Sequence, residues 1–385
     1  MSDVYNMKRY RNTTLVILIF TLLFSVGLSC NAQKKDRIFI DTLDNAFDIS
    51  HYMYNLNGLL PIVSPITEPA VGFGGALATL YFIPKKSDKN KGFQMPDIVG
   101  VVGGLTENGT WFAGGGYLGF WKDDHIRYRG VIGYGDVNLK YYGKGGDFLN
   151  NNPINFSLNS FGFLQQAMFR ISESRFMLGG KYVFTKSKVS VFNDAHWLNP
   201  KDFNVQNSGL GMIAEYESFD NFLSPNKGLK IYLDYIQFLE AIGGDRNFGR
   251  SILSLYYYKP LFSGKLISGL RLESQLATGE IPFYAKPFIF LRGVPAMRYQ
   301  GETTALVETE QLFLIGRRWG AVGFAGYGAA INLSDGKNST SHAWNVGTGF
   351  RYLIARQLGL RMGIDVAKGP DDWGIYIIFG SAWLR

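Results

Sequence analysis

The sequence has few of the residues from which reactive sites are built. Cys30 is the only cysteine among 385 residues, so no intramolecular disulfide can form, and no catalytic thiol or cysteine-rich metal site is expected. The four histidines lie in unrelated segments without the spacing of metal ligands. Neither a nucleophile elbow nor a phosphate-binding glycine loop is present. We therefore expect no catalytic residues, no metal, no cofactor and no enzymatic activity.

Long hydrophobic runs are also scarce, and the one that exists lies near the N-terminus. Leu15–Leu28 reads LVILIFTLLFSVGL and follows a basic stretch at Lys8–Arg11. The run is shorter than the roughly 20 residues that span a bilayer, and this combination is typical of an export signal. Residues 1–32 are predicted to be that signal, with cleavage after Ala32. Lipidation of Cys30 is the alternative.

The rest of the chain has neither a second long apolar run nor clear amphipathic helical segments. Glycine is abundant, with 47 residues, aromatic residues make up 15% of the chain, and the mean hydropathy is −0.02. Together with hydrophobic alternation of period two, this composition is typical of strands that face lipid on one side and water on the other. The net charge of +8 is scattered, which gives little support for nucleic-acid binding.

Strand periodicity is clearest in Lys265–Leu276 and Leu229–Phe238. In the first segment, leucines dominate one face, while Arg271, Glu273 and Gln275 lie on the other. Because charged side chains are costly toward lipid, the charged faces should line a wet lumen, although a soluble sandwich would also alternate. Short turns and longer loops mostly alternate along the chain, as expected of a barrel whose two ends face different compartments.

The strand count completes the predicted architecture. About 16 strands fit the chain, an even number, as is usual in bacterial barrels. The first strand, near Leu59–Ser64, is interrupted by prolines. We predict an all-β fold, a transmembrane antiparallel β-barrel over residues 58–385, preceded by a short periplasmic lead-in at residues 33–57.

The stretch Pro282–Ile315 carries the most specific motif of the sequence. Arg292 and Gly293 lie in a non-periodic segment that is too long for a hairpin turn, and a second cluster with Arg298 and Gly301 follows. Strands with period-two alternation flank the segment on both sides. This arrangement predicts a long loop between two strands that folds back into the barrel.

Two glutamates, Glu308 and Glu310, stand two residues apart on the strand that follows, so both project to the same side. They are natural lumen partners for an arginine, since a guanidinium fork between two carboxylates binds more strongly than a lysine would. Both Arg292 and Arg298 are candidates for the arginine that anchors the loop.

Together these features resemble the barrel of the outer-membrane insertase and translocase superfamily, the BamA and TamA type of the bacterial surface antigen family. The best match runs from Gly209 to Ala330. Within it, Asp220 and Asn221 followed by Pro225 and Gly228 are similar to the family's strand-to-turn segment. In such a turn the Asp and Asn cap the bend, the proline fixes φ, and the glycine permits re-entry into the strand.

The Arg-Gly pair resembles the family's sixth extracellular loop, whose arginine pairs inside the lumen with acidic residues of neighbouring strands. Gly293 would then allow a backbone geometry closed to other residues. Three departures predict a somewhat different loop geometry. Val294 replaces an aromatic residue, Phe288–Phe290 replaces paired glycines, and Gly326 stands where an aspartate is usual. Near the C-terminus, Asp372–Phe379 resembles the signal by which such barrels are recognised for assembly.

The resemblance implies a role in inserting or translocating a polypeptide or a lipid at the outer membrane, with the barrel integral to that membrane. Members of the family usually carry periplasmic POTRA domains, and residues 33–57 are too few for one. The partners implied are therefore outer-membrane lipid and a separate periplasmic subunit or client polypeptide, and no nucleic acid. A diffusion pore or specific channel without a partner protein is the alternative, and a barrel-borne lipid hydrolase is a third hypothesis.

Overall fold

The computed structural model describes residues 39–55, 58–83, 85, 96–142, 153–191, 203–333 and 339–383. Its backbone forms two compact units, Met1–Phe47 and Asp48–Arg385. In the first unit, Ile40 forms a β-bridge with Phe47. The predicted export signal, with Cys30, lies outside the described residues. Within the described part of the chain, no helix has both the length and the apolar character needed to cross a membrane.

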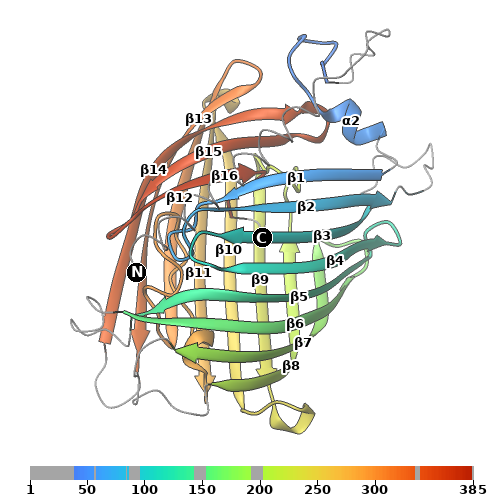
Figure 1. The fold of residues 1–385 in the computed structure, drawn as a ribbon. Coiled ribbons are helices and arrows are strands. Elements are labelled where there is room, and N and C mark those ends of the chain that lie inside the picture. Colours follow the sequence, from blue (N-terminus) through green and yellow to red (C-terminus); the bar gives the residue numbers. More distant parts are fainter. Residues whose placement is uncertain are drawn as a thin grey trace, which may run out of the picture. The chain divides into compact units, whose positions relative to one another are not determined.

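The second unit consists of one sheet of sixteen antiparallel strands that follow one another in sequence order, which confirms the predicted all-β architecture (Figure 1). The strands are β1 (Gly58–Ile66), β2 (Gly74–Ile83), β3 (Asp97–Thr106), β4 (Trp111–Trp121), β5 (Ile126–Tyr141), β6 (Ile154–Arg170), β7 (Phe176–Val191), β8 (Asn204–Glu217), β9 (Gly228–Phe238), β10 (Phe248–Leu261), β11 (Leu266–Gly279), β12 (Thr303–Ile315), β13 (Trp319–Asn332), β14 (Ser339–Ala355), β15 (Leu360–Lys368) and β16 (Trp373–Phe379).

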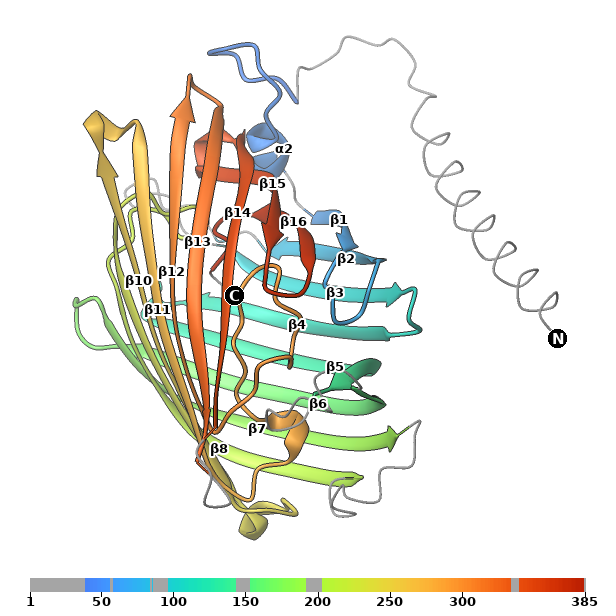
Figure 2. The same ribbon diagram turned by 90° about the vertical axis from the view of Figure 1, so that its left-hand side faces the viewer.

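In the described part of the chain, five short helices accompany the strands: α2 (Ser50–Asn55), η3 (Glu240–Ile242), η4 (Phe262–Gly264), η5 (Phe283–Ala285) and η6 (Arg356–Leu358). Figures 1 and 2 show β1–β8 curving around one side of this unit and β9–β16 around the other. The strands of a barrel must be tilted relative to the barrel axis, because only then can the sheet close upon itself.

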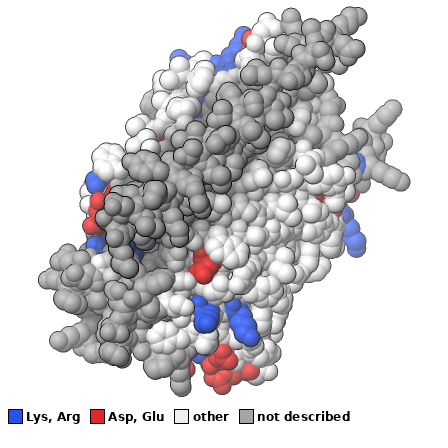
Figure 3. Space-filling model, in the orientation of Figure 1, with Lys and Arg blue, Asp and Glu red and all other residues white. Residues whose placement is uncertain are grey.

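On β11 and β12, side chains alternate between an apolar outer face and a more polar inner face. On the outside, Leu272 and Phe313 remain 41% and 52% exposed. On the inside, Arg271 and Glu308 are almost fully buried although both are charged. Figure 3 shows a broad outer surface on which few side chains are charged. This pattern is the one expected of strands with lipid on one side and a polar lumen on the other.

Several strands end where the sequence predicts short turns. Only a few residues separate β6 from β7, β10 from β11, β12 from β13, and β14 from β15. We call the end of the barrel with these connections the short-turn end. The predicted longer loops around residues 143–152, 192–202 and 334–338 lie outside the described residues, as does most of the segment 84–95.

The barrel is nearly closed, with a seam between its first and last strands. β1 pairs only with β2 and β16 only with β15, and the described residues form no hydrogen-bonded register between β1 and β16. The two strands nevertheless lie next to each other. Pro61 and Pro65 lie in β1, where the open side of an edge strand tolerates a residue that cannot donate a backbone hydrogen bond.

Candidate functional site

The segment between β11 and β12, residues 280–302, folds into the barrel, and we call it the lumen loop (Figure 2). It doubles back on itself, since the Ile289 N–H donates to the Tyr299 carbonyl at 3.0 Å and the Gly301 N–H donates to the Pro287 carbonyl at 3.0 Å. Ile289 and Leu291 are 1% and 2% exposed. Their side chains pack against two inner glycines of β13, Gly326 and Gly328.

Arg292 extends from this loop into a cluster of three carboxylates. Its guanidinium donates to Glu308 at 3.1 and 3.3 Å, to Glu310 at 2.8 Å and to Asp365 at 2.5 Å. One face of the guanidinium lies 3.5 Å above the centre of the Phe324 ring, a cation–π geometry. The side chain is only 7% exposed, so its charge depends on these partners rather than on water.

Gly293 permits the close approach that places this arginine. Its φ is +83°, and a Cβ atom there would lie 2.9 Å from the backbone nitrogen of Gly369 and 3.1 Å from the Ala367 backbone. Its own N–H donates to the hydroxyl of Tyr376 on β16 at 2.7 Å. A side chain would therefore be strained at this position and would push the loop away from β15 and β16.

Glu308 is the most connected residue of the cluster, at 1% exposure. Besides Arg292, it accepts hydrogen bonds from Arg271 at 3.4 Å, from the Asn345 amide at 3.1 Å and from the Trp383 indole at 2.7 Å. A carboxylate that is buried this deeply needs several donors to offset the loss of hydration. The glutamate thereby joins β11, β14, the lumen loop and the segment after β16.

The sequence reasoning missed several members of this cluster, above all Asp365 on β15. Asp365 is fully buried and accepts hydrogen bonds from Arg292 and Arg351, and Arg351 also lies 3.5 Å from Glu310. The alternation of Arg361, Gly363, Asp365 and Ala367 could have placed the aspartate on the inner face. Alternation does not reveal which strand lies opposite the aspartate inside the lumen.

Two of the three departures from the family pattern, Gly326 and Val294, lie at this cluster. Gly326 leaves no room for an acid, since a Cβ atom there would lie 2.6 Å from the Asn345 amide oxygen and 2.9 Å from Leu291. Asp365, two strands further along the sheet, supplies a carboxylate instead. Val294, in place of an aromatic residue, is 3% exposed and packs among the apolar residues under the loop.

We call Arg271, Arg292, Arg351, Glu273, Glu308, Glu310 and Asp365 the lumen ion network. Asn345 and Trp383 complete it as neutral donors. Every carboxylate of the network accepts at least one hydrogen bond from an arginine, so none is left as a free general base. Among the described residues, no group of acidic, histidine or cysteine side chains could hold a metal ion. The network fixes a loop in the lumen.

Arg298 lies elsewhere, at the end of the barrel opposite the short turns. Its guanidinium donates to Asp371, between β15 and β16, at 3.1 Å and stacks 4.1 Å from the Tyr142 ring centre. Although burial alone would raise the pKa of Asp371, hydrogen bonds from Arg298 and Tyr299 lower it below its usual value. Arg298 thus does not meet the two glutamates that Arg292 contacts.

The last predicted residue of the loop motif, Gly301, lies against the backbone of β13. A Cβ atom there would come within 2.6 Å of the Ile331 carbonyl oxygen. The Gly301 backbone is therefore held where only glycine fits, next to the start of β12.

The predicted turn motif forms the connection between β8 and β9. The Asp220 carboxylate accepts from the N–H groups of Asn226 and Lys227 at 2.9 and 3.1 Å. The Asn221 side-chain oxygen accepts from two further backbone N–H groups, both at 2.8 Å, and its amide donates to the Leu358 carbonyl at 2.9 Å. The turn is thereby closed upon itself and tied to the turn between β14 and β15.

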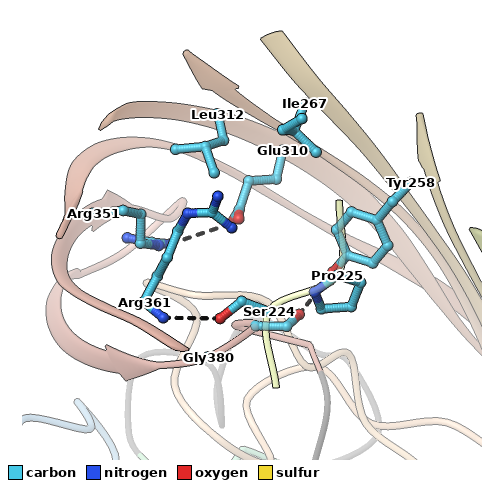
Figure 4. A pocket seen from close by; sticks show the side chains of 10 residues that line it. Ser224, Pro225, Tyr258, Ile267, Glu310, Leu312, Arg351, Arg361 and Gly380 are labelled. Atoms are coloured by element: carbon cyan, nitrogen blue, oxygen red, sulfur yellow. Dashed lines mark hydrogen bonds and ion pairs between the residues drawn. The ribbon is translucent and has the colours of Figure 1, made fainter. Parts of the chain in front are cut away.

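Gly228 and Pro225 complete this turn. Gly228 has a φ of +123°, and a Cβ atom would meet the Ser218 carbonyl at 2.4 Å. Pro225 lines a small cavity together with Glu310, Arg351 and Arg361 (Figure 4). The Arg361 N–H donates to the Ser224 hydroxyl at 3.0 Å, so the turn reaches across to β15.

The residues after β16, Gly380–Trp383, form a C-terminal tail that also turns into the barrel. The Ser381 N–H donates to the Leu223 carbonyl at 2.9 Å, and the Ser381 hydroxyl lies 2.7 Å from the Tyr258 hydroxyl. The Trp383 ring is 3% exposed and packs 5.6 Å from the Tyr258 ring. Turn, tail and lumen loop therefore meet at the lumen ion network.

Part of the chain matches a known family model. Residues 121–291 match the family model described as the Omp85 superfamily domain. The match covers β5–β11 and ends one residue before Arg292, so the acidic partners on β12 lie beyond it. No curated protein sequence matches the chain.

Solved structures share the barrel fold at low sequence identity. BamA from Haemophilus ducreyi lacking POTRA domains 1-3 gives a TM-score of 0.56 at 13% identity, over 84% of this chain and 70% of that chain. CdiB from Escherichia coli gives 0.59 at 9%, over 82% and 61%, and CdiB from Acinetobacter baumannii gives 0.56 at 15%, over 84% and 59%. The chain thus spans less than two thirds of the CdiB chains, and the likeness is one of fold.

Proposed function

Because the chain carries an Omp85 superfamily domain on a 16-stranded barrel, we propose that it is an integral outer-membrane protein that assists the insertion or translocation of a polypeptide or a lipid. Residues 1–32 would serve as the export signal and residues 33–57 as a periplasmic lead-in. The short-turn end would face the periplasm, because outer-membrane barrels have their short turns there.

The observation that carries the proposal is the seam between β1 and β16. A barrel used only as a pore gains stability from pairing its first and last strands, since an unpaired edge leaves backbone groups unsatisfied in lipid. Here the two edges lie next to each other without a hydrogen-bonded register among the described residues. An edge that is free to separate can accept a strand or let a lipid pass between lumen and bilayer.

The loop and the tail inside the lumen support the same proposal over the alternative of an open channel. Arg292 holds the lumen loop to the inner wall through three buried carboxylates, and the Trp383 indole of the C-terminal tail binds the same cluster. A diffusion pore needs a continuous water path, and these segments take up part of the lumen. The partners we propose are outer-membrane lipid and a separate periplasmic subunit or client polypeptide.

Reconstitution tests the proposed role directly. Vesicles with and without the purified protein would be mixed with an unfolded outer-membrane β-barrel polypeptide, and its folding would be followed by protease protection. A parallel arm would follow transfer of a fluorescent phospholipid between leaflets. Acceleration in either arm supports the proposal, and no acceleration in both would overturn it.

Single-channel recording in a planar bilayer separates the translocation role from the pore. We expect a closed or briefly fluctuating baseline for the native protein and larger, longer openings for Arg292→Ala. A large, steady open state in the native protein that Arg292→Ala leaves unchanged would favour the diffusion pore.

A further inference from the structure

The inner surface of the barrel is divided into a charged half and an apolar half. The inward direction is set by Arg127, whose guanidinium reaches Glu215 and Glu217 of β8 at 3.0 and 3.3 Å. Arg129 lies two residues further along β5 and therefore points inward as well. Its register partner on the neighbouring strand β4 is Leu118. The register then continues through Ile98 on β3 to Phe82 on β2.

Every inward position of β1–β4 that follows from this parity is apolar, glycine or a hydroxyl residue, and none is charged. The outward positions of the middle of these strands are apolar as well, as Leu77 and Val101 show with exposures of 55% and 59%. Among the inward residues, Val102 on β3 and Val131 on β5 are still 37% and 42% exposed. We call this inner surface, from β1 to the middle of β6, the apolar wall.

A row of glycines crosses the wall. Gly114, Gly133 and Gly162 are register partners on β4, β5 and β6, and Gly100 pairs with Gly116 beside them. A Cβ atom on Gly133 would fit in ordinary van der Waals contact, with a backbone oxygen at 3.6 Å as its nearest neighbour. Along this row the wall presents backbone rather than side chains.

One end of the wall carries an unneutralised cation. Arg129 is exposed, and no other described residue forms a hydrogen bond or an ion pair with its guanidinium, whereas its neighbour Arg127 contacts three carboxylates. Directly beside it on the outer face, Tyr128 stacks on Trp121 with ring centres 5.4 Å apart. Outward aromatic residues of membrane barrels lie at the level of the lipid headgroups, so in the proposed membrane location Arg129 would lie at headgroup depth on the inside.

The wall is also continuous with the seam. Its first strand is β1, whose free edge faces β16 without a hydrogen-bonded register among the described residues. From β1 to β6 the wall crosses five interstrand spacings of about 4.8 Å, or roughly 24 Å. A long acyl chain entering at the seam could lie along it for its whole length.

We propose that the apolar wall binds an acyl chain of an anionic phospholipid, whose phosphate pairs with Arg129. The chemistry of the wall favours this occupant over a polypeptide segment. A peptide would bring backbone N–H and C=O groups to a surface without partners for them, because the strands' own groups are used in the sheet. An acyl chain has no such groups, and a phosphate supplies the anion that the exposed guanidinium lacks.

The inference rests on the proposed membrane location, and one experiment tests the two separately. The protein would be reconstituted in bilayers containing phosphatidylglycerol with a photoreactive diazirine on its acyl chain, and adducts would be mapped by mass spectrometry. Labelling at the outward residues Leu77 and Val101 reports the membrane location. Labelling at the inward residues Leu118 and Val131 reports lipid in the lumen.

Two matched glycine variants make the inward signal interpretable. Gly133→Leu adds a side chain to the glycine row on the inner face, while Gly103→Leu adds the same side chain on the outer face of β3, and both new Cβ atoms would have a backbone oxygen as their nearest neighbour at 3.6 Å. We expect Gly133→Leu to reduce inward adducts at least fivefold and Gly103→Leu to leave them unchanged. Outward adducts should persist in both variants, which also shows that both fold.

The headgroup contact is tested by Arg129→Gln. We expect this variant to lose inward adducts about tenfold with phosphatidylglycerol, and to change little with a diacylglycerol probe of the same chain, which has no phosphate. Outward adducts without inward ones would overturn the inference and leave the membrane location intact. It would also be overturned by crosslinks that place residues 84–95 of the chain itself on the wall. Absence of outward adducts would refute the membrane location as well.

Discussion

Glu308 is a case in which one buried carboxylate organises side chains from distant parts of the sequence. It accepts hydrogen bonds from Arg271, Arg292, Asn345 and Trp383. Burying a charge costs several kcal/mol unless donors replace the lost water, so each of these donors has a measurable share in the stability of the barrel. The effects of substituting these donors on stability should be strongly coupled, because all of them share one acceptor.

Removing Arg292 should lower the stability of the barrel. Arg292→Ala would leave Glu308, Glu310 and Asp365 buried with fewer cations, and we expect a loss of about 3–5 kcal/mol in the free energy of unfolding. Arg292→Lys should lose less, because it keeps the charge but not the guanidinium fork. Urea unfolding in lipid vesicles, followed by tryptophan fluorescence, measures both.

Arg298→Ala is the matched control for this substitution. Its partner Asp371 is 39% exposed, and ion pairs that reach solvent contribute at most about 1 kcal/mol. Equal losses for Arg292→Ala and Arg298→Ala would contradict the central role that we assign to the buried network.

The indole of Trp383 offers a subtler test at the same site. Trp383→Phe keeps an aromatic ring beside Tyr258 but removes the N–H that donates to Glu308, so we expect a loss of about 1.5–3 kcal/mol in unfolding free energy. Trp344→Phe serves as the control, because Trp344 lies on the outer face at 43% exposure. A loss no greater than that of the control would show that the tail is not bound to the network in the membrane.

Asp371 gives a pH-dependent prediction. Its folded pKa lies below the unfolded value of 3.8, so the stabilisation from Arg298 and Tyr299 is fully present above pH 3.8 and is lost as the pH falls through the folded pKa. We expect Asp371→Asn to unfold at a lower temperature than the native protein from pH 8 to pH 5. The difference should shrink below about pH 3.8, and a difference that grows on acidification would contradict this sign.

At the scale of elements, the lumen loop connects the two sides of the seam. The Gly293 N–H donates to Tyr376 on β16 at 2.7 Å, and the Ala296 N–H donates to Glu68, between β1 and β2, at 3.1 Å. The two edge strands do not hold each other by a backbone ladder in the described residues. The loop's hydrogen bonds therefore link the two sides of the seam, where no backbone ladder joins them.

Loosening these two contacts should make the seam more dynamic without unfolding the barrel. We expect the double variant Tyr376→Phe with Glu68→Ala to increase backbone hydrogen exchange in β1 and β16 severalfold, while exchange in β6 and β7 stays unchanged. Exchange measured by mass spectrometry on the reconstituted protein resolves these segments. Unchanged exchange at both edges would show that the loop does not restrain the seam.

At the scale of the whole molecule, the proposed membrane location depends on the apolar outer face. Leu272 points outward near the middle of β11, and Leu272→Arg should cost about 2–4 kcal/mol of stability in lipid vesicles. Gln275 points inward on the same strand, where it donates to Glu273 at 2.9 Å and accepts from Arg250 at 3.4 Å, so Gln275→Arg should cost less than Leu272→Arg. Similar losses for both variants would mean that the outer face does not meet lipid.

Much of this architecture follows from local sequence patterns. Period-two alternation depends only on the pleat of a strand, so the number of strands and the faces of Arg271 and Glu308 could be predicted from neighbouring residues alone. The same holds for the turn at Asp220 and Asn221, whose side chains bind the backbone a few residues away.

The residues that lie opposite these inner faces are determined only by the way the whole sheet closes. Asp365 and Trp383 reach Arg292 and Glu308 because the curvature of the barrel brings β15 and the C-terminal tail back to β12, and no local pattern encodes that distance. The same closure leaves the edges of β1 and β16 side by side without a shared ladder. Side-chain direction is a property of each strand, whereas the partners across the lumen depend on how the whole sheet curves.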